Sequence, residues 1–207
     1  WSITIDVAPP EEIDPASPTR FPCTVEQGAD LDAWRHATAR HDATHRVAFT
    51  QRPRLLIVDA GGWPRDHTLL QAQKSLQHAL RFTDDGAAIL LVTSLAGGLG
   101  SEAFRLFARD GVALDRALLA PDRPAGLHVQ SVTSLREATT RRTVALWSDL
   151  AADEARALGL EPLESEAAAL EFCRRAGRDR HWGFLPRAEL FLPERGWLGG
   201  RAPGGHD

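Results

Sequence analysis

The polar residues best suited to chemistry lie just after a glycine-rich stretch. Gln71 and Lys74 are three positions apart, so a helix would place both on one face, in a stripe with His67 and His78. An ammonium group beside a side-chain amide can hold a carboxylate or a hydroxyl group. A purely structural role remains an alternative. Thr68 and Gln71 also match a capping box, and Lys74 could be an ordinary solvent-exposed side chain.

Two glycine-rich segments flank this helix in the sequence. Paired glycines allow positive φ or a close approach of the backbone to a ligand, and the second segment leads into a helix amino terminus, which attracts anions. Plain strand-to-helix turns explain both segments equally well. Neither matches GxGxxG or a phosphate-binding P-loop, which disfavours a dinucleotide-dependent dehydrogenase. The segments are Ala60-Gly61-Gly62-Trp63-Pro64-Arg65-Asp66 and Gly97-Gly98-Leu99-Gly100-Ser101.

The remaining histidines, cysteines and arginines favour structural roles. His41 and His45 have metal-ligand spacing, but the glutamate of HExxH is absent, so a solvated helix end is the better interpretation. Cys23 and Cys173 have no ligand partners nearby in the sequence and are interpreted as packing thiols. A cluster of cations is expected to complement a helix dipole: Arg174, Arg175, Arg178 and Arg180. We therefore expect no metal site in this chain.

Composition narrows the class of protein further. The chain has 207 residues, of which 43% are hydrophobic, and a net charge of 24 − 28 = −4. This size permits a substantial core, and the acidic balance disfavours a nucleic-acid partner. No apolar run approaches the roughly 18 to 20 residues of a membrane span. Two cysteines and no signal-peptide pattern predict a reduced cytoplasmic location, and a chain that opens on Trp1 without Met is expected to be part of something longer.

The elements that must position these residues alternate along the chain. Period-two alternation or short apolar runs predict strands at 2–7, 54–58, 88–93, 143–147 and 181–185. Helical periodicity and caps predict helices at 30–44 (with Leu31, Trp34 and Ala37 on one side), 69–80, 101–108, from the capping box Ser134-x-x-Glu137, 152–158 and 165–175. A proline-rich loop at 9–22 and a frayed tail from Gly196 are also expected.

This alternation predicts an α/β fold, a Rossmann-like three-layer domain with a mostly parallel sheet flanked by helices. Ligands of such sheets bind outside the carboxyl ends of the strands. The loops at 59–68 and 94–101 follow two predicted strands, so we expect any binding site to lie there.

Several segments together resemble the carboxyl-terminal domain of the nickel-dependent lactate racemase family. That family has AGG followed by an aromatic residue, P, K or R and D, then YQSQKAL, GGxIILV and a GLG turn. The resemblance is dense from about residue 54 to residue 107 and looser beyond, where Gly126-x-His128 and Ser148-Asp149-Leu150 fall in compatible order. The matching segments are Asp59–Asp66, Leu70–Leu76, Gly86 with its apolar strand, and Gly98-Leu99-Gly100 with Phe104.

The resemblance implies a two-domain enzyme whose active site lies in the cleft between the domains. The family interconverts stereoisomers of a 2-hydroxy acid with a nickel-pincer nucleotide, by removing the α-hydrogen as hydride and returning it to the opposite face. Residues 1–207 would be the carboxyl-terminal domain, with an initial strand and proline-rich segment in 1–29 and a flexible tail at 196–207. The nickel ligand, the tethering lysine and the proton-transferring histidines belong to an amino-terminal domain that this chain lacks. The expected partners are a small 2-hydroxy acid and that domain.

The resemblance also assigns residues. Gln71 and Lys74 match the positions that approach substrate and cofactor, so they are the expected catalytic residues. Leu70 stands where the family has tyrosine, and Ser94-Leu95 replaces a Glu-Cys pair, so we expect shifted substrate specificity. A non-catalytic α/β module that binds a small anion is the alternative function. The expected substrate- or cofactor-binding residues are Gly61, Gly62, Trp63, Asp66, Gly98 and Gly100.

Overall fold

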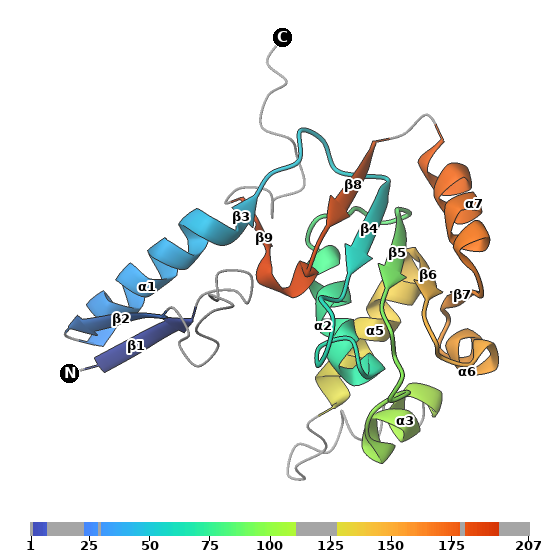
Figure 1. The fold of residues 1–207 in the computed structure, drawn as a ribbon, viewed down its shortest axis with the longest axis horizontal. Coiled ribbons are helices and arrows are strands. Elements are labelled where there is room, and N and C mark those ends of the chain that lie inside the picture. The colour runs from blue at the N-terminus through green and yellow to red at the C-terminus, as the bar shows by residue number, and fades with distance from the viewer. Residues whose placement is uncertain (1, 8–22, 29, 111–127, 179–180, 195–207) are drawn as a thin grey trace, which may run out of the picture. The chain divides into compact units, whose positions relative to one another are not determined.

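The computed structural model describes residues 2–7, 23–28, 30–110, 128–178 and 181–194, and it divides the chain into two compact units (Figure 1). The first unit extends to Val47 and the second begins at Ala48. The predicted loop at 9–22 and the predicted tail from Gly196 lie outside the described residues, as does Arg180. None of the described helices is both long and apolar enough to span a membrane.

The first unit is a β-hairpin with one helix. Strand β1 (Ser2–Val7) pairs antiparallel with β2 (Cys23–Gly28), and helix α1 (Asp30–His45) packs on both before the short strand β3 (Arg46–Val47). The predicted strand and helix are confirmed, but the predicted apolar side of the helix is wrong for Leu31 and Trp34. Ala33 and Ala37 are buried, whereas Leu31 and Trp34 are exposed, because small side chains at i and i+4 allow a close approach to the hairpin.

The second unit is built on a five-stranded sheet in which every pair of neighbours is parallel. This arrangement confirms the predicted α/β fold class. The strand at Glu161–Leu163 was not predicted, since three residues carry too little periodicity to be recognised. In spatial order the strands are β7 (Glu161–Leu163), β6 (Thr143–Trp147), β5 (Ala88–Val92), β4 (Leu55–Asp59) and β8 (Trp182–Leu185).

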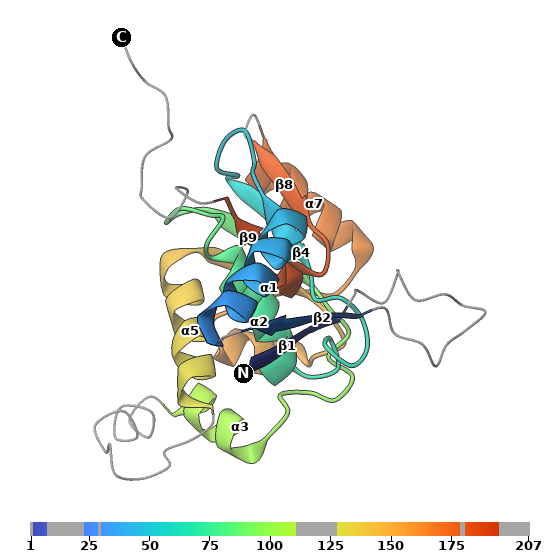
Figure 2. The same cartoon turned by 90° about the vertical axis from the view of Figure 1, so that its left-hand side faces the viewer.

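Helices lie on both faces of the sheet (Figures 1 and 2). Helices α2 (Leu69–Ala79) and α5 (Val129–Arg141) pack together on one face, and α7 (Glu166–Gly177) packs against four strands on the other. The residues of β4 alternate between the faces: Leu56 and Val58 are fully buried toward α2, and Leu55 contacts the cluster under α7. The other described elements are α3 (Glu102–Arg109), α6 (Ala152–Ala157), the 3-10 helix η2 (Ala188–Leu190) and β9 (Leu192–Pro193).

Most predicted helices of this unit are confirmed within a few residues, and one start is wrong. The capping box at Ser134-x-x-Glu137 does not open a helix, because it lies inside α5. The buried side chains Val132, Leu135 and Ala138 run through the box at helical spacing, and their burial sets the helix. Ser101 does cap α3, since its hydroxyl accepts from the Phe104 N–H at 3.1 Å.

A buried arginine connects α5 to the turn after α2. The Arg142 side chain is 7% exposed, and its guanidinium donates to the Thr83 carbonyl at 2.7 Å and to the Thr83 hydroxyl at 2.9 Å. Burial lowers its pKa, while the neighbouring carboxylate of Asp85 acts in the opposite direction. The fork of donors holds the end of α2 in place beside α5.

Replacing Arg142 with alanine should destabilise the second unit by about 2–4 kcal/mol, because buried carbonyl and hydroxyl groups lose charge-assisted hydrogen bonds. Urea unfolding measures the change. Arg141→Ala is the matched control, because the Arg141 side chain is 57% exposed and its loss should cost less than about 0.5 kcal/mol. Equal losses in the two variants would contradict this role for Arg142.

Candidate functional site

The carboxyl ends of the strands meet at one edge of the sheet. The register places Asp59, Val92 and Trp147 side by side at the ends of β4, β5 and β6. Leu163 ends β7 beside Trp147. The two glycine-rich loops start from this row, so the fold places them where ligands of parallel sheets bind.

The two loops are joined by backbone hydrogen bonds into one surface. The Leu95 N–H donates to the Asp66 carbonyl at 2.8 Å, and the Gly97 N–H donates to the His67 carbonyl at 2.8 Å. The Leu69 N–H at the start of α2 donates to the Gly98 carbonyl at 2.9 Å. The second loop therefore satisfies part of the amino terminus of α2, which limits the N–H groups this helix could offer to an anion.

The predicted glycines divide into two kinds. A Cβ at Gly61 would lie 3.0 Å from Cγ of Arg187, and one at Gly100 would lie 2.9 Å from Cβ of Leu70. Close packing therefore requires glycine at these two positions. Gly62 and Gly98 also have positive φ, but a Cβ there would meet nothing within 4 Å. Their backbones border open space, and a ligand can approach them closely.

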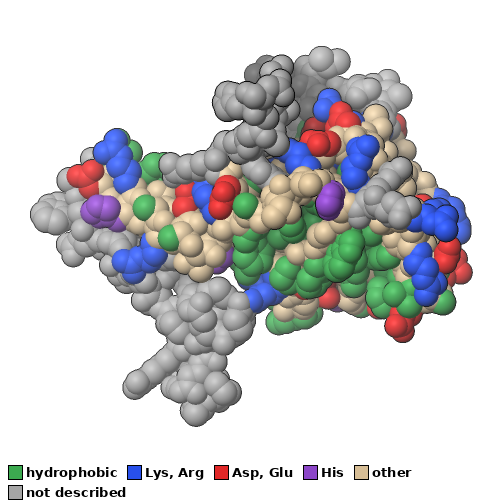
Figure 3. All heavy atoms as spheres, turned by 90° about the horizontal axis from the view of Figure 1, so that it is seen from above, with side chains coloured by type: hydrophobic (Ala, Val, Ile, Leu, Met, Phe, Trp, Pro, Cys, Tyr) green, Lys and Arg blue, Asp and Glu red, His purple; other side chains and the backbone are tan. Residues whose placement is uncertain are grey.

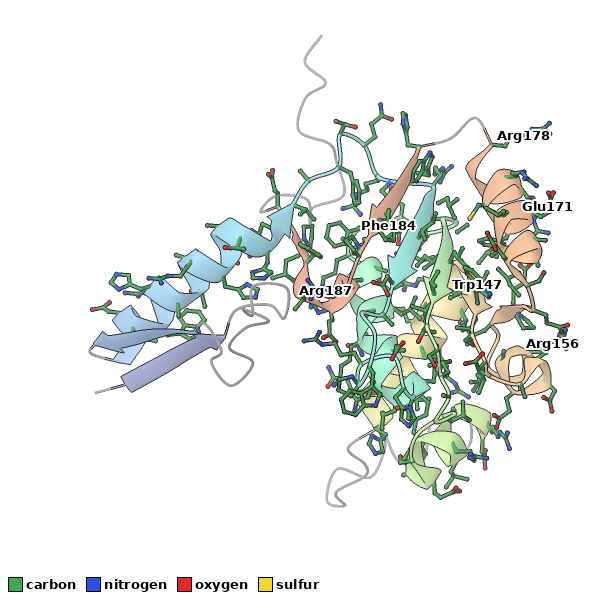
Figure 4. All side chains as sticks on the ribbon, viewed as in Figure 1. Trp147, Arg156, Glu171, Arg178, Phe184 and Arg187 are labelled. Carbon is green, nitrogen blue, oxygen red and sulfur yellow. The ribbon has the colours of Figure 1, made fainter. Side chains whose placement is uncertain are left out.

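Asp59 fixes the geometry of this edge. Its carboxylate accepts the Gly61 N–H at 2.9 Å on one oxygen and the Arg187 N–H at 3.2 Å on the other. Arg187 follows β8 with a φ of 43°, and Figure 4 shows it just beyond the end of that strand. One carboxylate thus joins the loop after β4 to the loop after β8.

A second link joins the same two loops, because Arg65 forms an ion pair with Glu189. Sequence reasoning missed this third loop. The strand at 181–185 was predicted, but no local signal indicated that it would lie beside β4. The parallel pairing of Val58 with Leu185 brings the two loops together.

Gln71 and Lys74 lie together on the exposed side of α2. The Lys74 ammonium donates to the Gln71 amide oxygen at 2.7 Å. The capping-box alternative for Gln71 is wrong, because Thr68, the N-cap residue of α2, makes no side-chain capping hydrogen bond. His78 does not share the solvent-exposed surface of this pair. Its Nδ1 lies 2.8 Å from the Phe191 carbonyl oxygen, and burial lowers the pKa of the His78 imidazole. Gln71 and Lys74 remain exposed, and both keep N–H groups that could donate to a ligand.

A pocket of about 390 Å³ opens at the carboxyl edge. Of the predicted site residues, Gly62 and Asp66 line this pocket. The others do not: Gly61, Trp63, Gln71, Lys74, Gly98 and Gly100. Trp63 is 81% exposed, and Trp147 projects at the end of β6 (Figure 4). The lining is rich in acidic and hydroxyl groups: Asp59, Asp66, Thr93, Ser94, Ser148, Asp149 and Glu164. Such a pocket suits hydroxyl groups and disfavours a further anion.

Other candidates fall outside this edge. The His41 and His45 rings stack 4.2 Å apart, and His45 Nδ1 contacts the His41 carbonyl. Among the described residues, no group of three or more His, Cys, Asp or Glu side chains is arranged to hold a metal ion. Cys173 is a partly buried free thiol whose pKa is raised by burial.

The parallel sheet with helices on both faces defines a three-layer α/β protein. Two solved structures have a similar fold. The lactate racemase apoprotein from Thermoanaerobacterium thermosaccharolyticum superposes with a TM-score of 0.72 over 93% of this chain, at 16% identity. A crystal structure of a protein from Thermotoga maritima superposes with a TM-score of 0.56 over 84% of the chain, at 14% identity. No protein-family model matches the sequence, and no curated protein matches it.

These likenesses confirm the resemblance at the level of the fold. The chain covers 46% of the lactate racemase chain and 45% of the Thermotoga chain, so it spans about half the length of each. The fold shared with a lactate racemase apoprotein agrees with the segments that suggested that family, which lie in and around β4, α2 and β5.

Replacing Asp59 with alanine should destabilise the second unit by about 1–3 kcal/mol, because the Gly61 and Arg187 N–H groups lose their acceptor. Hydrogen exchange should speed up at these two amides more than elsewhere. Asp66→Ala is the control: no described side chain pairs with the Asp66 carboxylate, and the change should stay within about 0.5 kcal/mol. Unchanged exchange at Gly61 and Arg187 would contradict the role of Asp59.

Proposed function

We propose that residues 1–207 are the substrate-side, carboxyl-terminal domain of a nickel-pincer-dependent racemase or epimerase of 2-hydroxy acids. The active protein then includes an amino-terminal domain and works in the cytoplasm. The fold shared with the lactate racemase apoprotein supports the class of enzyme. The domain assignment follows from the resemblance of the segments between residues 54 and 107.

The observation that carries the proposal is the exposed pair of Lys74 and Gln71. One ammonium hydrogen is used by the Gln71 oxygen at 2.7 Å, so two hydrogens remain for a substrate carboxylate. The Gln71 amide nitrogen can donate to the same carboxylate or to the 2-hydroxyl group. Closing a cleft over this pair would desolvate the carboxylate, and a fixed cation offsets that cost. In this role the pair holds the substrate while the α-hydrogen leaves and returns.

The cofactor of such an enzyme, a nickel-pincer nucleotide derived from nicotinic acid, supplies a hydride acceptor when it is bound. The chain offers a suitable surface for a flat ring: the exposed Trp63 and the open backbone at Gly62 and Gly98. Lys74 is the chain's single lysine, and the proposal assigns it to the substrate. The tethering lysine and the nickel ligand are therefore assigned to the amino-terminal domain.

The residues around the pair support a specificity other than lactate. Leu70 stands where the family has tyrosine, and it packs against Gly100 without offering a hydroxyl group. Leu95, which replaces a polar residue of the family, is 1% exposed. The acidic pocket nearby disfavours a second carboxylate on the substrate. We therefore propose a 2-hydroxy monocarboxylate other than lactate, with a side chain that does not depend on a tyrosine hydroxyl for recognition.

In the protein that joins this chain to its amino-terminal domain, Lys74→Ala should lower kcat/KM by about two orders of magnitude or more. The reason is the loss of the cation that meets the carboxylate, a change of roughly 2–5 kcal/mol. Gln71→Ala should cost about 1–2 kcal/mol, as expected for one hydrogen bond. Racemisation or epimerisation of a panel of 2-hydroxy acids measures both effects.

Arg81→Ala removes an equal charge from an exposed side chain just after α2, so it should leave the rate unchanged while the melting temperature serves as a folding control. Wild-type rates in Lys74→Ala would overturn the site. Binding of a 2-hydroxy acid that depends on Lys74, without interconversion of any acid in the panel, would favour the non-catalytic binding module instead.

A further inference from the structure

The face of the sheet that carries α7 exposes large apolar side chains over β4 and β8. The register aligns Leu55 with Trp182 and Ile57 with Phe184, so all four project from this same face. Trp182 is 64% exposed and Phe184 is 50% exposed. Figure 4 shows Phe184 on β8, away from α7. The sheet thus has an apolar strip beside α7.

A groove of about 840 Å³ runs between α7 and this strip. Leu55, Ile57 and Trp182 line its floor, and Leu170 and Cys173 line its α7 wall. Leu55 and Trp182 begin their strands, so the groove lies toward the amino ends of β4 and β8. It is therefore separate from the glycine loops at the opposite ends.

Parallel sheets are normally covered by helices on both faces, because both faces are apolar. Exposed patches of large apolar side chains on such a sheet mark interaction sites. Figure 3 shows hydrophobic side chains gathered on the second unit, with Lys and Arg side chains and Asp and Glu side chains together at one border. A second helix laid beside α7 would bury Trp182 and Phe184 and complete the layer.

The charge around the groove defines the chemistry of that helix. The charged side chains that line it are Glu171 and three arginines, at positions 174, 175 and 178. Glu171 lies 3.4 Å from Arg174, and Glu161 lies 2.7 Å from Arg175. Arg178 lies at the end of α7 (Figure 4). Among the ion pairs of the described residues, none includes its guanidinium, unlike those of Arg174 and Arg175. A covering helix with carboxylates at its flank would pair with this cation.

The Arg178 cation also disfavours a second copy of the chain as the occupant. A two-fold contact would place Arg178 and its copy in one interface with no carboxylate to pair with either, and like charges across an interface cost binding energy. We propose that the groove is a docking surface for an amphipathic helix of a partner protein, with an apolar stripe on Trp182 and Phe184 and acidic residues toward Arg178.

Cys173 provides a direct readout, because its thiol lines the groove and is only partly buried. The probe is a synthetic helical peptide with leucines at helical spacing and glutamates on its flanks. At a concentration ten times its Kd, it should slow the alkylation of Cys173 about tenfold, since only the free fraction reacts. Peptide mapping by mass spectrometry separates Cys173 from Cys23. A peptide with lysines in place of the glutamates should protect at least tenfold less well at equal concentration.

Two variants locate the contact on exposed side chains, which keeps the fold intact. Trp182→Ala with Phe184→Ala should abolish the protection, and Arg178→Glu should reverse the preference between the acidic and basic peptides. Circular dichroism checks folding in each case. Equal protection by both peptides, or unchanged protection in Arg178→Glu, would overturn the proposal. Protection by decanoate but not by the acidic peptide would overturn it in favour of a small amphiphile, and concentration-dependent dimers that protect Cys173 would overturn it in favour of a second copy.

Discussion

The carboxylate of Asp59 is the constraint on which the geometry of the site depends. Asp59 ends strand β4, and its carboxylate accepts N–H groups from two loops that are 126 residues apart in the sequence, at Gly61 and Arg187. A carboxylate that accepts two backbone N–H groups is a strong, directional connection. Without it, the pairing of β4 with β8 would still bring the two turns together, but the hydrogen bonds that fix Gly61 and Arg187 relative to each other would be lost.

The site follows from that connection in steps. The fixed turn leads the chain through Asp66 and His67, whose carbonyls accept from the second glycine loop. The second loop in turn supplies the carbonyl that holds the first N–H of α2. The orientation of α2 decides where Gln71 and Lys74 project, and it places them on the solvent side of the helix. The proposed substrate-holding pair therefore depends on backbone contacts in three loops. The buried face of α2 anchors the helix through Leu69 and Leu76.

Much of the fold could be predicted from the sequence, because strands that are buried on both faces, such as β4 and β5, consist of continuous apolar runs. The helix at 69–80 was recognisable by its stripe of leucines and alanines. The strand order could not be predicted, since no local sequence signal indicates that Trp182–Leu185 pairs with β4. The candidate site was predicted in the same partial way. The glycine loops and the pair of Lys74 and Gln71 could be recognised from residue types and their spacing. The acidic pocket and the hydrogen bond between Asp59 and Arg187 depend on the pairing of strands that are far apart in the sequence.

In the proposed reaction, the α-hydrogen of a 2-hydroxy acid is removed and returned to the same molecule. The direct test uses a 2-hydroxy acid deuterated at the α-carbon, with this chain joined to its amino-terminal domain and loaded with cofactor in ordinary water. The account predicts that the opposite stereoisomer forms with the deuterium retained at the α-carbon. Products that carry solvent hydrogen at that carbon, or no interconversion of any 2-hydroxy acid tested, would contradict it.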